Sequence, residues 1–289
     1  MDEAEKDLVY TILILIGLAL VWYFTGGPSR PSARSGPFLN KPMTTHQQEI
    51  IYQTKKEADN APSLKRGEEK DSAFKYRATL VVGSGAKESS PPKEYIEIKA
   101  SPVNEKFILL TGWLLKNKKG ETVKIGKGSY LPYPATINSQ QIIFLKPGEK
   151  AYITTGESPI GTSFRVNKCM GYLEEFQNFY PPLAKECPLA SEGPIPDHLD
   201  GNCLDFINKI PRCETVTDDT LSEISGACRK YVTQEINYRA CVQNHKSDPD
   251  FYGKEWRIYL GKNKELWNNN EETVLLLDKN GKTIDWQTY

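Results

Sequence analysis

The chain has 289 residues, enough for one large domain or two small ones, and its 38% hydrophobic and 26% charged residues are typical of a protein with a packed core. Lys plus Arg and Asp plus Glu number 37 each, so the formal net charge is zero. This balance excludes a global field that would draw the chain to nucleic acid or an anionic membrane, and a nucleic-acid role would require a local basic patch.

The first predicted element is an apolar segment at residues 8–27. Residues 8–24 (LVYTILILIGLALVWYF) carry no charge, and with residues 25–27 they reach the roughly 20 residues that cross a bilayer as a helix. A cleavable signal peptide fits less well because the start is acidic and no small-x-small site follows. A buried core helix also fits less well because the segment has no polar face. We expect a transmembrane anchor within residues 1–27.

The sequence signals for membrane orientation disagree. Arg30, Arg34 and Lys41 follow the apolar segment, and the positive-inside rule would leave the C-terminal side in the cytoplasm. Long domains cross membranes largely regardless of flanking charge, and clustered cysteines suit an oxidising compartment. We therefore expect a single-pass protein whose soluble region is extracytoplasmic.

Residues 28–72 are rich in Pro, Ser, Gly, Lys and Glu. Such a composition cannot bury enough apolar surface to fold, so we expect a disordered tether. From residue 73 the pattern changes to short segments rich in β-branched and aromatic residues, which predict strands. They are FKYRATLVV, EYIEIKA, FILLTGWLL, TVKIG, QIIFLK, KAYITT, WRIYLG and TVLLLD.

Turn residues lie between several of these segments. Pro147-Gly148 predicts a type II turn between QIIFLK and KAYITT. Residues 117–120 predict a hairpin, and Asn280-Gly281 predicts a second hairpin with a type I′ turn. Short antiparallel strands at this spacing are typical of a β-sandwich.

The strand segments, in this order, resemble the lamin-tail domain, an immunoglobulin-like β-sandwich of nuclear lamins and of many bacterial surface and secreted proteins. The resemblance covers residues 73–167 and 248–289 and implies one antiparallel sandwich interrupted by an insert, as in bacterial membrane-anchored versions. Gly112 is expected to allow a close backbone approach beside a core ring at Trp113. The segments that carry the resemblance are EYIEI at 94–98, LTGWLL at 110–115, IFLKPG at 143–148, TVLLLD at 273–278 and NGKTID at 280–285.

The predicted insert, residues 168–247, has helical stretches near 171–179, 198–209, 221–235 and 237–244, with Asp218, Asp219 and Ser222 as expected N-caps or first-turn acids. An even, clustered set of cysteines without a Cys-x-x-Cys pair indicates disulfides rather than a zinc site. The connectivity stays open, and independent reduced thiols are the alternative. The disulfide candidates are Cys169, Cys187, Cys203, Cys213, Cys228 and Cys241.

No catalytic motif stands out among the chemistry-bearing residues. The densest polar cluster surrounds His198, and its oxygens and imidazole suit Ca²⁺ or a transition metal. Its spacing fails the EF-hand pattern, so a turn and helix N-cap before Cys203 is the preferred interpretation. We expect no catalytic residue, metal or cofactor. The other members of the cluster are Asp197, Asp200, Asn202 and Asp205.

The remaining candidates are aromatic residues, which are expected either in the hydrophobic core or on a surface that contacts a ligand. The tryptophans fall in strand-like segments, where core packing is expected and a ligand-stacking surface is the alternative. The loop SYLPYPAT is expected to present an exposed contact patch. The residues concerned are Trp113, Trp256, Trp267, Trp286, Tyr130 and Tyr133.

The leading hypothesis is a non-catalytic surface protein, anchored through residues 8–27, that binds or scaffolds another protein or an envelope polymer. The first alternative is an envelope hydrolase or metal-dependent enzyme with its site in the helical insert. The second alternative is nucleic-acid binding, which the balanced charge disfavours.

Overall fold

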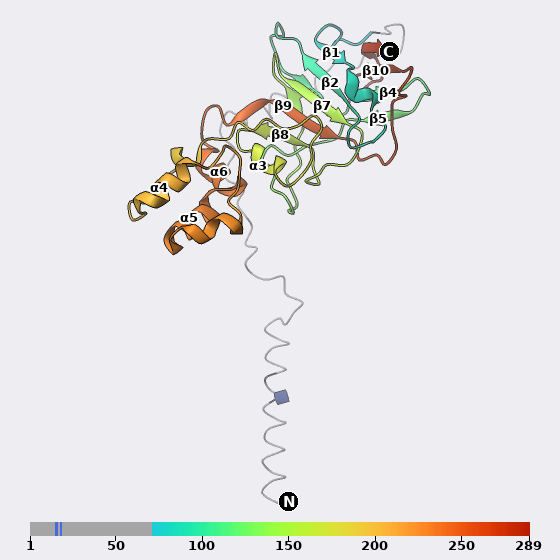
Figure 1. Cartoon of the computed structure of the whole chain (residues 1–289). Coiled ribbons are helices and arrows are strands. Elements are labelled where there is room, and N and C mark those ends of the chain that lie inside the picture. The colour runs from blue at the N-terminus through green and yellow to red at the C-terminus, as the bar shows by residue number, and fades with distance from the viewer. Residues whose placement is uncertain (1–14, 17, 19–70) are drawn as a thin grey trace, which may run out of the picture. The chain divides into compact units, whose positions relative to one another are not determined.

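The computed structural model describes residues 15, 16, 18 and 71–289, without the side chains of residues 218–220 (Figure 1). The predicted anchor and tether therefore lie almost wholly outside the described residues. No helix in the described part is long and apolar enough to span a membrane. Asp71 and Ser72, expected in the tether, already belong to the folded part, because the N–H of Ser72 donates to the carbonyl oxygen of Thr283 at 2.8 Å.

The described part is mainly β, with two larger sheets and one small sheet. The neighbouring strands are antiparallel except β7 and β9, whose parallel pairing departs from the all-antiparallel expectation. The five-stranded sheet has the order β1 (Ala78–Val81), β2 (Tyr95–Ala100), β7 (Lys150–Thr154), β9 (Tyr252–Tyr259) and β8 (Phe164–Asn167). The four-stranded sheet has the order β11 (Thr283–Thr288), β10 (Thr273–Leu277), β4 (Leu114–Lys116) and β5 (Thr122–Lys124), and the small sheet pairs β3 (Ile108–Leu109) with β6 (Phe144–Leu145).

The two larger sheets share one hydrophobic core. In β2 the buried Ile96 and Ile98 alternate with Glu97 and Lys99, which confirms the predicted period of two. Core side chains come from all three sheets, so each sheet covers apolar surface that the others would leave in water. The core includes Leu80, Ile96, Ile98, Ile153 and Trp256 from the five-stranded sheet, Leu115, Val123, Val274 and Leu276 from the four-stranded sheet, and Ile108 and Leu145 from the small sheet.

Turn residues explain two of the connections, one as expected and one with a correction. The type II turn is confirmed, since Gly148 has φ 76° and the N–H of Glu149 donates to the carbonyl oxygen of Lys146 at 3.0 Å. The final hairpin does not use the expected I′ turn, because Gly281 takes φ 78° while Asn280 stays at negative φ. Inside this turn the Asp278 carboxylate accepts the N–H groups of Asn280 and Lys282 at 2.8 and 3.0 Å, and this hydrogen bonding holds the bulged turn.

The role of Gly112 also differs from the expectation. A Cβ at this position would have its nearest contact at 3.7 Å, so no close backbone approach requires glycine. The residue instead has φ 96°, a left-handed conformation that side chains rarely adopt. Trp113 beside it is 2% exposed, as expected for a core ring.

Residues 168–251, called here the helical region, connect β8 to β9, and the strands and their loops are called the β region. Figure 1 shows α4, α5 and α6 gathered at one end of this folded part, away from β10 and β4. The N-cap of α5 is Ser225, whose hydroxyl accepts the N–H of Cys228 at 3.3 Å. The expected caps at 218, 219 and 222 lie instead in the preceding 3₁₀ helix. The helices are α3 (Gly171–Glu174), α4 (Gly201–Asn208), α5 (Gly226–Glu235) and α6 (Tyr238–His245), and the 3₁₀ helices are η1 (Ser84–Lys87, in the β region), η2 (Ala190–Glu192) and η3 (Asp218–Glu223).

The predicted disulfide framework is confirmed, because all six cysteines are paired within the helical region. A second hydrophobic core surrounds the sulfur atoms and extends to Phe164 of β8. Disulfides close loops of the unfolded chain and so supplement a small core. The pairs are Cys169–Cys241, Cys187–Cys213 and Cys203–Cys228.

Candidate binding groove between strands β1 and β11

The loop that contains Tyr130 and Tyr133 is not the exposed patch expected from sequence. The Tyr130 ring packs edge-on against Trp256, with centroids 4.9 Å apart, and burial raises the pKa of its hydroxyl. Tyr133 packs against the second core, and the hydroxyl of Tyr238 in α6 donates to the carbonyl oxygen of Pro132 at 2.7 Å. The loop therefore joins the two cores, and its aromatic side chains are used for packing.

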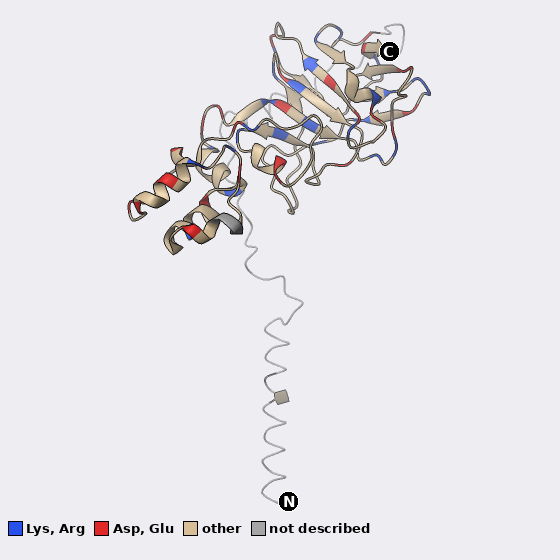
Figure 2. Ribbon diagram, viewed as in Figure 1, with Lys and Arg blue, Asp and Glu red and all other residues tan. Residues whose placement is uncertain are grey.

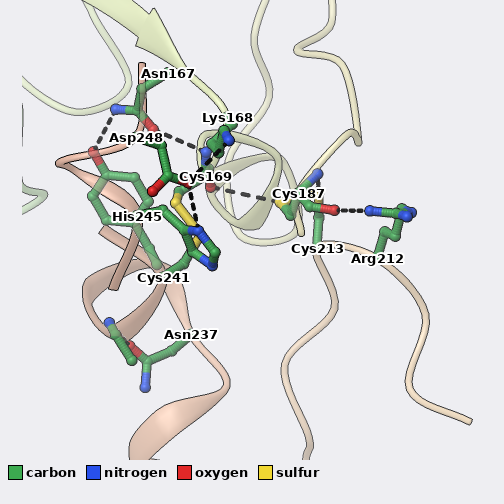
Figure 3. Close-up of a disulfide and its surroundings, with 12 residues drawn as sticks. Asn167, Lys168, Cys169, Cys187, Arg212, Cys213, Asn237, Cys241, His245 and Asp248 are labelled. Carbon is green, nitrogen blue, oxygen red and sulfur yellow. Dashed lines mark hydrogen bonds and ion pairs between the residues drawn. A yellow bond between two sulfur atoms is a disulfide. The ribbon is translucent and has the colours of Figure 1, made fainter. Parts of the chain in front are cut away.

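A groove of about 520 Å³ lies where the helical region meets β8, and we call it the junction groove (Figure 3). Four of its charged side chains bind one another. Lys168 Nζ lies 2.6 Å from a carboxylate oxygen of Asp250 and 3.1 Å from one of Asp248, and His245 Nδ1 lies 2.9 Å from the same Asp248 oxygen. The hydrogen bonds from His245 and Lys168 hold the pKa of Asp248 below its usual value. Arg212 donates to the carbonyl oxygen of Cys187 at 2.5 Å, so it too has a structural partner.

The polar cluster around His198 provides a helix cap. Asp200 Oδ1 accepts the N–H of Cys203 at 2.8 Å, which confirms the predicted N-cap before this cysteine. Within residues 71–289 no group of three or more His, Cys, Asp or Glu side chains is placed to hold a metal ion. Two other acidic residues of the helical region also bind backbone: Glu174 accepts the N–H of Leu183, and Glu175 accepts the N–H of Thr215.

The tryptophans divide into core and surface. Trp113, Trp256 and Trp267 are at most 2% exposed and belong to the first core. Trp286 is 60% exposed, which corrects its expected place in the core. A register shift between Leu276 and Leu277 explains the difference, because one extra residue in a strand moves the following side chains to the opposite face. As a result Trp286 lies opposite Leu275, on the outer face of the four-stranded sheet.

The exposed Trp286 ring lines a second groove, of about 600 Å³, which we call the seam groove. Its walls come from β1, β10, β11 and the turn at residues 71–76. β1 and β11 are edge strands of the two larger sheets, so the groove follows the line where the sheets meet. Tyr76 is its second large aromatic residue and is 82% exposed.

The backbone of Tyr76 has φ 66°, a left-handed conformation at a bulky residue. For an L-residue this conformation costs roughly 1–2 kcal/mol, and the exposed ring gains little burial in return. Lys75 holds the neighbouring position through an ion pair of 2.6 Å with Asp71, and its ammonium lies 5.4 Å from the Tyr76 ring centre. The turn thus directs a tyrosine to solvent where glycine would be less strained.

The carboxylate of Asp285 accepts one backbone N–H from each of the two strand edges at the seam. Its Oδ2 accepts the N–H of Leu80 in β1 at 2.8 Å, and its Oδ1 accepts the N–H of Trp286 in β11 at 2.9 Å. Edge strands with unpaired N–H groups invite another strand to pair, and an inward charged side chain is one way to prevent this. The seam groove therefore offers side chains, rather than a strand edge, to a ligand.

Sequence reasoning named Trp286 but missed Tyr76 and the groove. Tyr76 lies in the segment FKYRATLVV, whose pattern predicts a strand throughout, whereas β1 begins at Ala78. Nothing in that segment signals a positive φ, since glycine and asparagine are the usual markers. No protein-family model matches the chain, and no curated protein matches it either.

Proposed function

We propose that this protein is a membrane-anchored, non-catalytic module that binds an envelope polymer or protein outside the cytoplasm. The observation that carries this proposal is the seam groove, where exposed Tyr76 and Trp286 line one depression between two strand edges. Large aromatic rings contribute strongly to binding when a partner covers them, and they are otherwise costly to expose to water.

We also propose that the β region has the immunoglobulin-like lamin-tail fold. Two sheets around one core support this assignment, and so does the order of the segments that carry the resemblance. EYIEI ends in β2, LTGWLL leads into β4, IFLKPG contains β6 and its turn, and the last two segments form the β10–β11 hairpin. The helical region enters this fold between β8 and β9.

The position outside the cytoplasm rests on chemistry of the cysteines. Three disulfides form and persist in oxidising compartments, which supports an exported soluble region. The apolar segment at residues 8–27 supplies the length needed for an anchor, and the polar composition of residues 28–70 suits a tether that gives the binding module reach.

The non-catalytic assignment is supported by four acidic side chains of the helical region that already have structural partners. Asp200, Glu174 and Glu175 each accept backbone N–H groups, and Asp248 is shared by Lys168 and His245. A general acid or base must instead reach a proton of the substrate.

The charge distribution bears on the alternative of nucleic-acid binding. Residues of both charges are interspersed over the strands (Figure 2), whereas a protein that binds phosphates usually presents a stripe of positive charge.

Cross-linking in native membranes tests the proposal. The full chain is compared with a chain truncated after residue 72, which keeps the anchor and tether, and cross-linked material is identified after solubilisation. We expect partners of the full chain to be missing from the truncated chain, and added protease to cleave the soluble region from the outer side of intact cells. An identical partner set for both chains, or a soluble region protected from outside, would contradict the proposal.

A further inference from the structure

We propose that the seam groove binds a neutral, β-1,4-linked hexopyranose chain, with Trp286 and Tyr76 stacking on the faces of sugar rings. This inference rests on the proposed binding function and names its ligand class. Equatorial β-1,4 linkages keep such a chain extended and flat, so successive sugars present C–H faces that suit aromatic rings in an open groove.

The two rings are both exposed, but for different structural reasons. Trp286 is turned outward by the register shift in β11, and Tyr76 by its left-handed backbone. Neither ring appears among the aromatic pairs that pack the described residues, whereas Tyr130 and Trp256 pack on each other. The local fold accepts strain at Tyr76 without gaining burial, which points to a role in contact with a ligand.

The polar groups of the groove suit a neutral ligand with many hydroxyls. Thr79, Thr273, Thr283 and Gln287 line it with uncharged donors and acceptors. Lys75, which also lines the groove, is already paired with Asp71 at 2.6 Å. An anionic polymer would need unpaired cations to offset its charge, so this lining favours a neutral polymer over a phosphate chain.

A peptide strand is a poorer fit, because three of the backbone groups along these edges already have partners. Asp285 accepts the N–H groups of Leu80 and Trp286, and the carbonyl oxygen of Thr283 accepts the N–H of Ser72. Strand addition draws its affinity from main-chain hydrogen bonds to an open edge. Stacking and side-chain hydrogen bonds do not require that edge.

The test is calorimetric titration of the purified full chain in detergent with hexamers of β-1,4-linked glucose and of β-1,4-linked N-acetylglucosamine. We expect at least one hexamer to bind, with a blue shift of tryptophan emission as Trp286 is covered. Trp286→Ala and Tyr76→Gly should each weaken binding roughly tenfold or more, by analogy with the loss of an aromatic side chain that stacks on a nucleic-acid base. Phe176→Ala is the matched control, because Phe176 is 66% exposed and lies outside the groove.

Several outcomes would overturn the proposal. The proposal is wrong if neither hexamer binds. It is also wrong if both groove variants bind a hexamer as tightly as the unchanged chain does. Binding of a polyanion such as heparin alone, with a steep salt dependence, would assign the groove to an anionic ligand. A groove-dependent cross-link to a protein without sugar binding would assign it to a protein partner. In these last cases the membrane cross-linking described above still reports a partner of the soluble region, so this inference can fail while the proposed function stands.

Discussion

The carboxylate of Asp285 in β11 accepts the backbone N–H of Leu80 in β1 at 2.8 Å, and so joins the edges of the two larger sheets. Its other oxygen accepts the N–H of Trp286 at 2.9 Å. One side chain thereby satisfies two edge donors that would otherwise face solvent or another strand. This arrangement also fixes the wall of the seam groove beside the exposed indole.

Asp285→Ala should lower the free energy of unfolding by about 1–2 kcal/mol, since hydrogen bonds to a charged acceptor are lost while water regains access to the donors. Asp285→Asn should cost about half as much, because its one carbonyl oxygen retains one of the two bonds. Urea unfolding followed by tryptophan fluorescence measures both. We also expect Asp285→Ala to self-associate more in sedimentation experiments, and equal behaviour of the two variants would contradict this role.

Tyr76→Gly should raise the free energy of unfolding by about 0.5–1 kcal/mol, because glycine adopts the left-handed backbone without the penalty of a Cβ but is more flexible when unfolded. Tyr76→Ala is the matched control, since it removes the ring and keeps the Cβ. The urea midpoint of Tyr76→Gly should be higher than that of Tyr76→Ala. A glycine variant no more stable than the alanine variant would show that the backbone is not strained.

Glu149 and Arg165 form a buried ion pair, with 2.5 Å between Oε1 and Nη2 and 6% exposure of each side chain. Glu149→Gln should cost about 3–5 kcal/mol, because Arg165 keeps a buried charge without its partner. The double variant Glu149→Leu with Arg165→Met should cost much less, since it removes both charges. A double-mutant cycle that adds the single variants Glu149→Leu and Arg165→Met, followed by urea unfolding at pH 7, measures the coupling, and additive effects would contradict it.

The same pair predicts acid sensitivity. Burial by itself raises the pKa of Glu149, but the hydrogen bonds and charge of Arg165 outweigh it and hold the pKa below its usual value. The stabilisation is therefore fully present above the ordinary glutamate pKa of about 4.3, and it is lost as the pH falls through the lower pKa of the folded state. The decrease in the urea midpoint from pH 6 to pH 3 should be smaller in the double variant.

Mapping disulfides in the non-reduced exported protein should give the pairs Cys169–Cys241, Cys187–Cys213 and Cys203–Cys228. Replacing Cys169 and Cys241 by serine should destabilise by about 4 kcal/mol, since the closed loop spans 72 residues. Replacing Cys203 and Cys228, 25 residues apart, should cost about 3 kcal/mol. Far-UV circular dichroism measures the loss of helix in each serine variant. A different pairing in the disulfide map would refute the disulfide arrangement.

Tyr238→Phe tests the link between the two cores. The variant removes the hydrogen bond from the hydroxyl to the Pro132 carbonyl and should cost about 1–2 kcal/mol, because a buried acceptor is left unpaired. Amide hydrogen exchange should accelerate in the loop at residues 129–136. Tyr231→Phe in α5 is the control, because its hydroxyl contact to Pro194 is longer, at 3.4 Å, and exposed. Equal exchange in the two variants would speak against the link.

The sequence by itself determined the features that depend on neighbouring residues along the chain. The alternation in β2, the type II turn at Pro147-Gly148 and the Asp200 cap are local, because their side chains act within a few residues of their own backbone. The clustering of the cysteines indicated disulfides for a similar reason, since it is a property of composition and spacing.

Tertiary structure decided the features that depend on register and on contacts between distant segments. A one-residue shift in the β10–β11 pairing moved Trp286 from the expected core to the surface, and the Tyr130 loop became a link because α6 approaches it. The pairing of the cysteines, the left-handed Tyr76 and the seam groove arise from segments up to about two hundred residues apart, such as Leu80 and Asp285. Local propensity carries no information about such distances, so only the packed fold places these residues together.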